Sequence, residues 1–451
     1  GIQIDALTLS FRSATYGTTL NGKVSGAGKL IFDGTGGAGG LTLTNGANDY
    51  SGGTLWAADG GTNGAWDLFT VTASGALGSG DVSLQGGNQN TWVAGFVGTP
   101  TAFTFSGNTT QANHFILTGD ATISVGSPAT ASATADRVTL TGDIDLGSRT
   151  LYVRGPGTGT ISGVISGTGG VTKIDTPGTW VLTGNNTYTG ATTVSAGQLQ
   201  VGSGGAGRTG TGNVTVQNGG TLFGTGVIQG TNFTAASGST VQAGDSTAAG
   251  SFGTLNFTPA TGGGTQSLAG QVILDIGTAN NAGSVDPTFG GNVVGSAGYI
   301  TYVNDTSRAQ GLGSGNHDLL SFNTAGDTTG YNLTVSGTLV VRSSGFSAAL
   351  GQVYNLVDWS GVVITDFSGF NLGTNYRDGS GDDASQFDLP TLSGGLVWDV
   401  SQFTTSGIIV VVPEPERVLL LMLGFAALVS RRRRGRDKLE REAAFAGRTA
   451  G

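Results

Sequence analysis

Two carboxylates lie two positions apart in the segment TGDIDLG, at Asp143 and Asp145. Alternate residues of a β-strand point to the same side, so these carboxylates would form a pair if the segment were extended. Paired carboxylates perform acid–base chemistry in enzymes that cleave polysaccharides. The same spacing also describes a solvated strand face, and that interpretation is the favoured one.

A second acidic group occurs in the segment DGSGDD, which contains Asp378, Asp382 and Asp383. Oxygen ligands at alternating positions are typical of calcium loops. The segment lacks the full EF-hand pattern and its closing Glu, so an acidic turn is favoured and these three residues are a weak calcium candidate.

Two histidines, His114 and His317, are far apart in the sequence, and the chain has no Cys. A zinc site would therefore depend mainly on carboxylates, and we expect each His at the surface or in a turn. No GxSxG elbow is present, and the glycine run at 36–40 lacks the Lys-Ser/Thr ending of a phosphate-binding loop. The sequence predicts no catalytic residue, no cofactor and no resident metal, with a β-helix polysaccharide lyase or hydrolase as the second interpretation.

The composition indicates strands joined by turns. Of 451 residues, 84 are Gly and only 11% are charged. Each Gly in a helix interior costs about 1 kcal/mol relative to Ala, whereas the abundant Thr, Val, Leu and Ile suit strands. The acids before residue 411 are all Asp, which favours turns, and the net charge of −9 disfavours nucleic acid as a partner. Residue 1 is Gly within a strand-like segment, so we expect the true N-terminus to lie upstream.

Internal repeats organise the chain. The clearest copy, residues 170–201, reads GVTKIDTPGTWVLTGNNTYTGATTVSAGQLQV, and a looser copy covers residues 29–56. Tyr188 and Tyr50 fill the same position in the two copies, and each copy follows a similar lead-in. Short alternating strands of this kind cannot each bury a face alone, but stacked coils share one apolar interior. The pattern predicts an all-β fold, a β-solenoid in the form of a parallel β-helix, with a β-sandwich array as the alternative.

The clear copy resembles the autotransporter-associated β-strand repeat. The matching residues are Lys173, Gly178, Leu182, Thr183, Gly184, Asn186, Thr187, Tyr188, Gly190, Thr192, Thr193, Gly197, Leu199 and Val201. The resemblance implies a right-handed β-helix on an exported bacterial protein, and it implies no particular ligand. We therefore expect a β-solenoid over residues 1–260, and a further solenoid or capping β region over residues 261–410, with Trp359 and Trp398 as core or capping aromatics.

The chain changes character at its C-terminal end. Val418 to Val429 is apolar apart from Gly424 and would span about 18 Å as a helix, against roughly 30 Å of hydrocarbon. The arginines that follow would stay on the cytoplasmic side of a membrane. Pro413 and Pro415 would stop a helix upstream and leave an extended, accessible stretch before the membrane.

This layout resembles the PEP-CTERM sorting signal. The matching residues are Val412, Pro413, Glu414 and Pro415, then the apolar run, then the basic cluster Arg431, Arg432, Arg433 and Arg434. The resemblance implies that a membrane-embedded cysteine transpeptidase, an exosortase, receives the chain in a Gram-negative bacterium. We expect a sorting signal and anchor over residues 411–434 and a polar cytoplasmic tail over residues 435–451. The tail is a departure, because the family usually ends at the arginines. A plain tail anchor is the alternative.

Together these features predict an exported, non-enzymatic protein of the cell surface or extracellular matrix that acts in adhesion. Its expected partners are an exosortase, the membrane through the C-terminal helix, and extracellular polysaccharide. A polysaccharide-binding module is an alternative that exposed aromatics at Trp56, Trp66 and Trp92 would favour, although buried core positions are expected for them.

Overall fold

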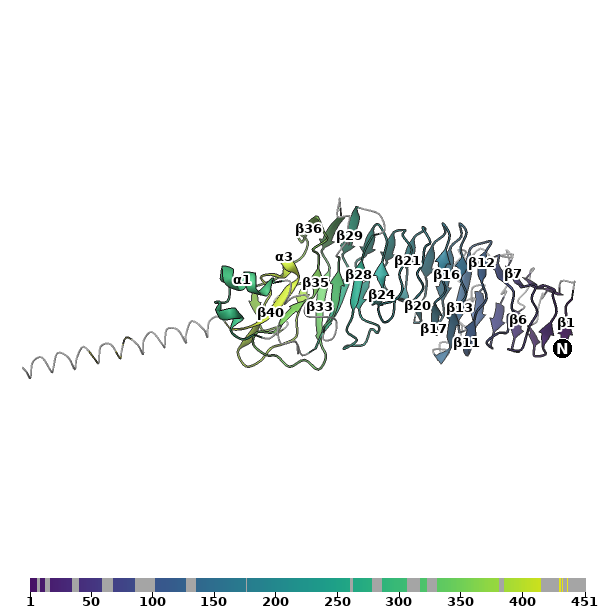
Figure 1. Cartoon of the computed structure of the whole chain (residues 1–451), viewed down its shortest axis with the longest axis horizontal. Coiled ribbons are helices and arrows are strands. Elements are labelled where there is room, and N and C mark those ends of the chain that lie inside the picture. The colour runs from purple at the N-terminus through teal and green to yellow at the C-terminus, as the bar shows by residue number, and fades with distance from the viewer. Residues whose placement is uncertain are drawn as a thin grey trace, which may run out of the picture.

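The computed structural model describes residues 1–5, 9–12, 17–34, 40–58, 68–85, 102–126, 135–175, 177–259, 263–277, 286–305, 317–322, 331–380, 385–414, 430, 432 and 436. These residues form an elongated stack of β-coils with a smaller antiparallel sheet at its C-terminal end (Figure 1). The predicted parallel β-solenoid is confirmed.

The first side of the stack, the long sheet, contains thirteen parallel strands within the described residues. They are β3 (Thr18–Leu20), β6 (Gly40–Leu43), β8 (Leu68–Val71), β10 (Ala102–Phe105), β13 (Ala121–Val125), β16 (Leu151–Arg154), β19 (Val171–Lys173), β21 (Thr192–Val194), β23 (Val214–Val216), β26 (Phe233–Ala235), β29 (Gly264–Leu268), β32 (Tyr331–Val335) and β36 (Ile364–Asp366).

The second side, the middle sheet, contains ten strands of the described chain. They are β11 (Asn108–Gln111), β14 (Arg137–Leu140), β17 (Thr158–Ile161), β20 (Thr179–Leu182), β22 (Gly197–Val201), β24 (Gly220–Gly224), β27 (Thr240–Ala243), β30 (Gln271–Ile276), β33 (Thr338–Ser343) and β38 (Phe387–Asp388).

The third side is divided along the stack. Its N-terminal part, the short sheet, contains β2 (Leu9–Arg12), β5 (Leu30–Gly34), β7 (Thr54–Ala58), β9 (Val82–Leu84), β12 (Phe115–Leu117), β15 (Ile144–Asp145) and β18 (Ile165–Ser166). Its C-terminal part contains β25 (Val227–Ile228), β28 (Thr254–Phe257), β31 (Leu319–Ser321) and β35 (Val357–Asp358). A separate pair, β1 (Ile2–Gln3) and β4 (Val24–Ser25), lies in the first coils.

Each full coil passes from the long sheet to the middle sheet and then to the third side, as β13, β14 and β15 do. Every described pairing between successive coils of these sheets is parallel, which is the pattern expected when repeated units stack in one direction. Gly at a corner supplies left-handed backbone, as at Gly197 with φ of +72°.

The interior is built from residues in register on the long sheet. One interior row runs Leu41, Phe69, Phe103, Ile123, Val153, Lys173, Val194, Val216, Ala235, Leu268 and Val335, and every member except Lys173 is apolar. Phe69 and Phe103 stack with ring centroids 4.6 Å apart. The row forms one continuous core along the stack, which matches the aliphatic interior expected of a solenoid.

The C-terminal end has a different architecture. An antiparallel sheet contains β34 (Val353–Asn355), β40 (Ile408–Pro413), β39 (Leu396–Asp399) and β37 (Tyr376–Arg377), in that order. Among the described residues, the helical segments that accompany it are η2 (Phe289–Gly291), α1 (Ala297–Val303) and α3 (Phe403–Ser406). Trp398 and Trp359 are buried there, as expected, and their indole N–H groups donate to the carbonyl oxygens of Pro390 and Thr405.

Candidate functional site

A row of hydroxyl side chains runs along the outer face of the long sheet. Six consecutive strands, β19, β21, β23, β26, β29 and β32, place a Thr or Ser at the same register position. The members of this hydroxyl row are Thr172, Thr193, Thr215, Thr234, Ser267 and Thr334. Because paired strands are 4.7–4.9 Å apart, the row extends over about 24 Å.

The hydroxyl row is open to solvent. Thr234 is exposed and the other five members are half-buried, whereas their apolar neighbours on the same strands point into the core. In the described part of the chain, none of the six hydroxyls makes a side-chain hydrogen bond with another residue. Corner hydroxyls behave differently, since Thr168 Oγ1 donates to the carbonyl of Gly147 at 3.1 Å. The donors and acceptors of the hydroxyl row are therefore directed to an external partner or to water.

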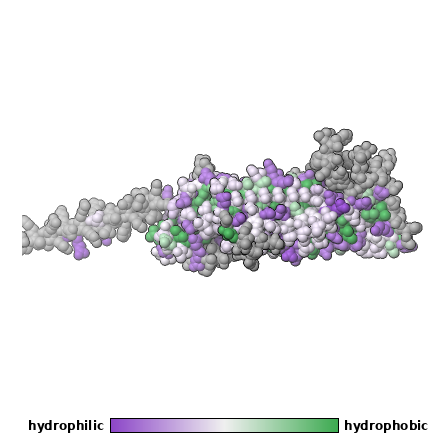
Figure 2. Space-filling model, turned by 90° about the horizontal axis from the view of Figure 1, so that it is seen from above, coloured by the Kyte–Doolittle hydropathy of each residue, from purple (hydrophilic) through white to green (hydrophobic). Residues whose placement is uncertain are grey.

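The hydroxyl row is also uncharged. Among the residues of its six strands, only Lys173 carries a charge at neutral pH, and that side chain is fully buried. Figure 2 shows one side of the stack, where strongly hydrophilic residues, residues of intermediate hydropathy and scattered hydrophobic ones are interspersed over the described surface. The uncharged hydroxyl row itself offers hydrogen bonds without electrostatic attraction.

Lys173 occupies the interior row but turns its amine to the backbone. Its Nζ donates to the carbonyl of Ile174 at 2.7 Å and also reaches the carbonyls of Asp175 and Ala196. Burial lowers the pKa of Lys173 to about 8, the carboxylate of Asp175 raises it, and the cation of Arg154 lowers it further. Asp175 forms an ion pair with Arg154, which is itself 5% exposed. This corner therefore holds two buried cations against one carboxylate.

The Asn of each repeat connects three successive coils. Asn186 Oδ1 accepts from the backbone N–H of Ile165 at 2.8 Å, and its Nδ2 donates to the carbonyl of Arg208 at 2.7 Å. Asn48 makes the equivalent bonds to the N–H of Val24 and the carbonyl of Ala76, both at 2.8 Å. The side-chain amide provides hydrogen-bond partners for backbone groups of the two neighbouring coils. The Asn of the repeat therefore holds successive coils together.

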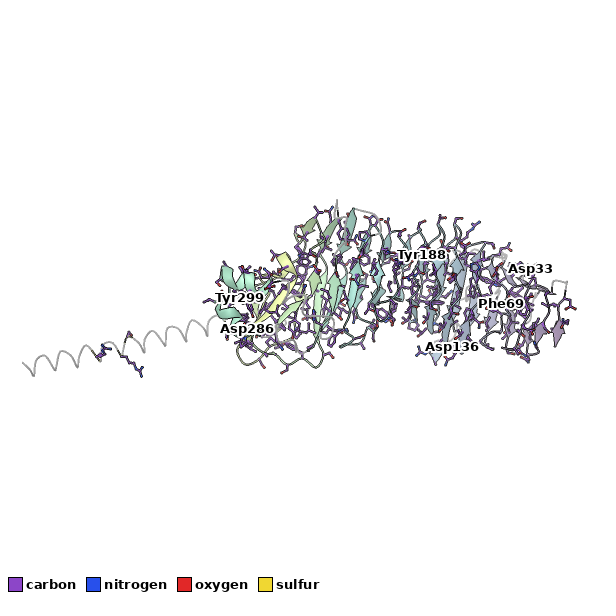
Figure 3. All side chains as sticks on the ribbon, in the orientation of Figure 1. Asp33, Phe69, Asp136, Tyr188, Asp286 and Tyr299 are labelled. Carbon is purple, nitrogen blue, oxygen red and sulfur yellow. The ribbon has the colours of Figure 1, made fainter. Side chains whose placement is uncertain are left out.

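The Tyr of each repeat is internal as well. Tyr188 and Tyr50 are fully buried, and each hydroxyl is 2.6 Å from a Thr hydroxyl four residues later, Thr192 or Thr54. Burial raises the pKa of Tyr50 to about 12, although its bond to Thr54 lowers it. Tyr188 lies midway along the stack (Figure 3). The Asn and Tyr of the repeat signature therefore have structural roles, whereas Thr193 of the same signature belongs to the outward hydroxyl row.

The predicted carboxylate pair accepts hydrogen bonds from backbone N–H groups. Asp143 Oδ1 accepts from the N–H of Val164, and Asp145 Oδ1 accepts from the N–H of Gly147, both at 2.8 Å. Asp145 thus satisfies its own turn, and Asp143 bonds to the next coil, so both carboxylates have structural partners, in agreement with the favoured interpretation of a strand face.

A buried acidic cluster was not found by sequence reasoning. Asp275 and Asp318 are both 0% exposed, and Arg342 Nε lies 2.7 Å from Asp275 Oδ1. Asp318 accepts from the N–H groups of Gly253 and Asp275, while burial raises its pKa to about 8. The sequence signal that could have indicated the cluster is Asp275 in the strand QVILDI, a charged residue within an otherwise largely apolar strand. The cluster joins β30, β33 and the residue before β31, and the backbone before β28 donates to it.

The two histidines differ in environment. His114 is exposed, with Nδ1 at 3.7 Å from Asp81 Oδ1. The expectation of a surface position is wrong for His317, which is 4% exposed, and burial lowers its pKa to about 4. Its backbone forms a bridge with Ile276 and its ring packs edge-on against Tyr354, so tertiary packing encloses a residue whose local sequence reads as a turn.

The predicted sorting residues are only partly within the described chain. Pro413 ends β40 and Glu414 donates its N–H to the carbonyl of Gly395 at 3.0 Å, and both residues are half-buried. Arg432 is helical and exposed. Pro415, Arg431, Arg433, Arg434 and the apolar run 418–429 lie outside the described residues. In the described portion, no helix has the length and hydrophobicity needed to cross a bilayer.

The calcium candidate is likewise only partly described. Asp378 Oδ1 accepts from the N–H of Ser380 at 3.0 Å, and the Ser380 bonds lower the pKa of Asp378. Asp382 and Asp383 lie outside the described residues. Across the residues that are described, His, Asp and Glu form no group of three that could hold a metal ion.

Of the three tryptophans considered as binding aromatics, only Trp56 lies within the described residues. Trp56 is fully buried, as expected, and packs edge-on against Phe103 with ring centroids 6.1 Å apart. Trp66 and Trp92 lie outside the described residues. Trp56 therefore serves the core and offers no binding surface.

Comparison with known proteins agrees with the repeat assignment. The family model of the passenger-associated-transport-repeat matches residues 36–55 and 171–201. A segment of 120 residues is 43% identical to the adhesin BmaC autotransporter of Brucella suis biovar 1 (strain 1330). That alignment covers 26% of this chain and 3% of the relative, so the chain spans a small part of the curated relative that it matches. No solved structure matches the chain significantly. The similarity therefore concerns two repeat segments of this chain and a stretch of 120 residues that resembles part of an autotransporter adhesin.

Proposed function

We propose that the chain is an exported, non-enzymatic scaffold of the bacterial cell surface that acts in adhesion through the outer faces of its β-stack. The observation that carries the proposal is that different residues of the coils have internal and outward roles. The Asn and Tyr that define the motif are used internally, while the hydroxyl row leaves its donors and acceptors outward. The similarity to part of an autotransporter adhesin supports the same function.

Surface display and attachment test this proposal directly. Antibodies raised against residues 135–259 should label intact cells that produce the chain, and deletion of the gene should reduce attachment of those cells to a surface that they colonise. Complementation should restore both signals. Labelling that requires permeabilised cells would contradict surface display, and unchanged attachment after deletion would contradict a role in adhesion.

We further propose that the C-terminal segment is a sorting signal processed by an exosortase, after an intermediate anchored in the inner membrane. The order of Pro413, Glu414 and Pro415, the apolar run and the arginines supports it. The position of Pro413 at the end of the last described strand is compatible, because the signal would begin where the folded body ends.

The mass of the mature C-terminus tests the sorting proposal. In cells with an exosortase the chain should lose Arg431 to Arg434, and in cells without one it should retain them. Replacement of Pro413, Glu414 and Pro415 by Ala should block the loss, while Lys438→Met, beyond the arginines, should leave it unchanged. Retention of the arginines in both strains would refute exosortase processing.

A further inference from the structure

We propose that the hydroxyl row binds an uncharged, extended polysaccharide whose chain lies along the axis of the stack. This inference rests on the proposed adhesive function and specifies the chemical class of its partner. It uses the outer face of the long sheet between β16 and β32, and none of the internal bonds of the repeat.

The first argument is periodicity. Parallel pairing repeats the same register position on every coil, so the hydroxyls recur at about 4.8 Å. A linear glycan in an extended conformation also presents its hydroxyl groups at regular intervals, at every sugar or, in a β-1,4-glucan whose successive sugars face opposite ways, at every second sugar. A rigid row can therefore contact recurring sugars in the same way, and a longer glycan gains affinity by adding equivalent contacts.

The second argument is chemistry. The row offers hydroxyls that both donate and accept, which match the hydroxyl groups of a sugar. Its six strands offer no surface charge, because Lys173 points inward and is fully buried, and the exposed Asp366 of β36 pairs with Thr334 only at the far end of the row. The whole chain carries a net charge of −9, which disfavours an acidic polymer. A neutral polysaccharide is the partner that meets both conditions.

The third argument is the end of the row. Tyr152 of β16 pairs in register with Thr172 and is half-buried on the same outer face. An aromatic ring there offers an apolar surface for a sugar ring to pack against, in addition to its hydroxyl. The row thus begins with an aromatic residue and continues with six hydroxyls.

The middle sheet supplies a matched control surface. Its outer column includes Thr158, Thr221 and Thr240, but Thr179 donates to Gln198 at 2.8 Å between them, which interrupts the free hydroxyls. Three Thr→Val substitutions on either sheet remove the same atoms from the same part of the stack. Val keeps the shape and the strand preference of Thr, so both variants should fold.

The experiment is affinity electrophoresis of the full chain in native gels that contain hydroxyethylcellulose, a neutral linear glucan, or alginate, an acidic polymer. We expect hydroxyethylcellulose to retard the wild-type chain and alginate to leave it unretarded. The variant Thr193→Val, Thr215→Val, Thr234→Val should show a roughly tenfold higher dissociation constant. The control Thr158→Val, Thr221→Val, Thr240→Val should match wild type. Circular dichroism should give the same spectrum for all three proteins. If the triple variant does not fold, Thr215→Asp, which puts one charge at the centre of the row, replaces it and should show the same loss.

Three results would overturn the inference: no retardation of the wild-type chain, equal retardation of the hydroxyl-row variant, or retardation by alginate alone. Sedimentation of the same proteins distinguishes a second copy of the chain as the occupant. Self-association that the hydroxyl-row variant loses, without retardation of wild type by hydroxyethylcellulose, would assign the face to that copy. If the wild-type chain is not retarded by hydroxyethylcellulose but cells that display it still attach, the glycan is rejected as the partner and the adhesive function is retained.

Discussion

The two repeat copies make the same contacts on different sides of the stack. In the copy at 29–56, the Asn48–Tyr50 turn follows β6 of the long sheet and leads into β7 of the short sheet. In the copy at 170–201, the Asn186–Tyr188 turn follows β20 of the middle sheet and leads into β21 of the long sheet. The copies are therefore offset by one side of the coil. The motif encodes a local turn that clamps neighbouring coils, and it does so whichever sheets it joins.

The largest effect should come from removing the buried ring. We expect Tyr188→Ala to lower the free energy of local unfolding of the surrounding coils by about 3–5 kcal/mol, because it leaves a cavity in a closed core. Tyr50→Ala should cost a similar amount if the two turns are equivalent. Native-state hydrogen exchange of coils 165–216 and 24–84 measures both. Tyr152→Ala on the outer face is the control, and a comparable loss there would contradict the argument from burial.

The next effect is a pH dependence of stability that only one copy should show. Lys173 of the copy at 170–201 occupies the position of Phe32 in the copy at 29–56, and both side chains are buried. The folded-state pKa of Lys173 is lowered from 10.5 to about 8. Between these two values the unfolded chain binds more protons than the folded chain, so the unfolding free energy should rise with pH, by up to about 3 kcal/mol. Lys173→Met should lose this rise.

Urea unfolding at pH 8, 9 and 10 measures the unfolding free energy of wild type and of Lys173→Met. The difference between the two proteins tests the prediction, because the titration of other groups cancels in it. Phe32→Met is the matched control and should keep the wild-type slope. A slope that Lys173→Met leaves intact would show that this amine is not the source of the pH dependence.

A smaller effect should follow from removing the stitching amide. Asn186→Ala leaves the N–H of Ile165 and the carbonyl of Arg208 without a partner, which should cost about 1–3 kcal/mol. Asn48→Ala should cost the same within that range. Asn185, next in sequence and exposed, provides the control substitution Asn185→Ala. Thermal unfolding followed by circular dichroism measures all three, and an equal loss for Asn185→Ala would reject the stitching role.

The smallest effect should come from the Tyr hydroxyl alone. Tyr188→Phe and Tyr50→Phe each lose one hydrogen bond to a Thr while keeping the ring, so about 1 kcal/mol is expected for each. The double variants Tyr188→Phe with Thr192→Val, and Tyr50→Phe with Thr54→Val, should recover part of that loss because no buried hydroxyl is then left unpaired. A further loss in the double variants would contradict this pairing.

The fold was predictable because its signals are local and repeated. Alternation in segments such as TWVL and the Asn–Tyr turns indicated stacked strands, and β20 and the turn at 186–188 are found where expected. The antiparallel arrangement at the C-terminal end was not predictable, since β34 and β40 pair across more than fifty residues. Long-range pairing of this kind leaves no periodic trace in the sequence.

The candidate face was harder to predict than the fold. Three strands of the hydroxyl row show only a Thr between apolar neighbours, as in VTV at 214–216, and the other three have a polar residue on one side. Their alignment depends on the number of residues in each coil, which varies between successive strands of the long sheet. His317 and Asp318 illustrate the same limit, because their burial comes from β30 and the residues around Tyr354 and not from their neighbours in sequence.

Strand β40 has a mechanical consequence. It lies between β34 and β39, and the last described body residue, Glu414, follows it directly. Hydrogen bonds between antiparallel strands are perpendicular to the strands, so a pull applied through Glu414 along β40 would load both ladders in shear. Many bonds would then resist together, in contrast to peeling, where they break one at a time. A chain held at this end and bound elsewhere would therefore bear tension across two ladders at once.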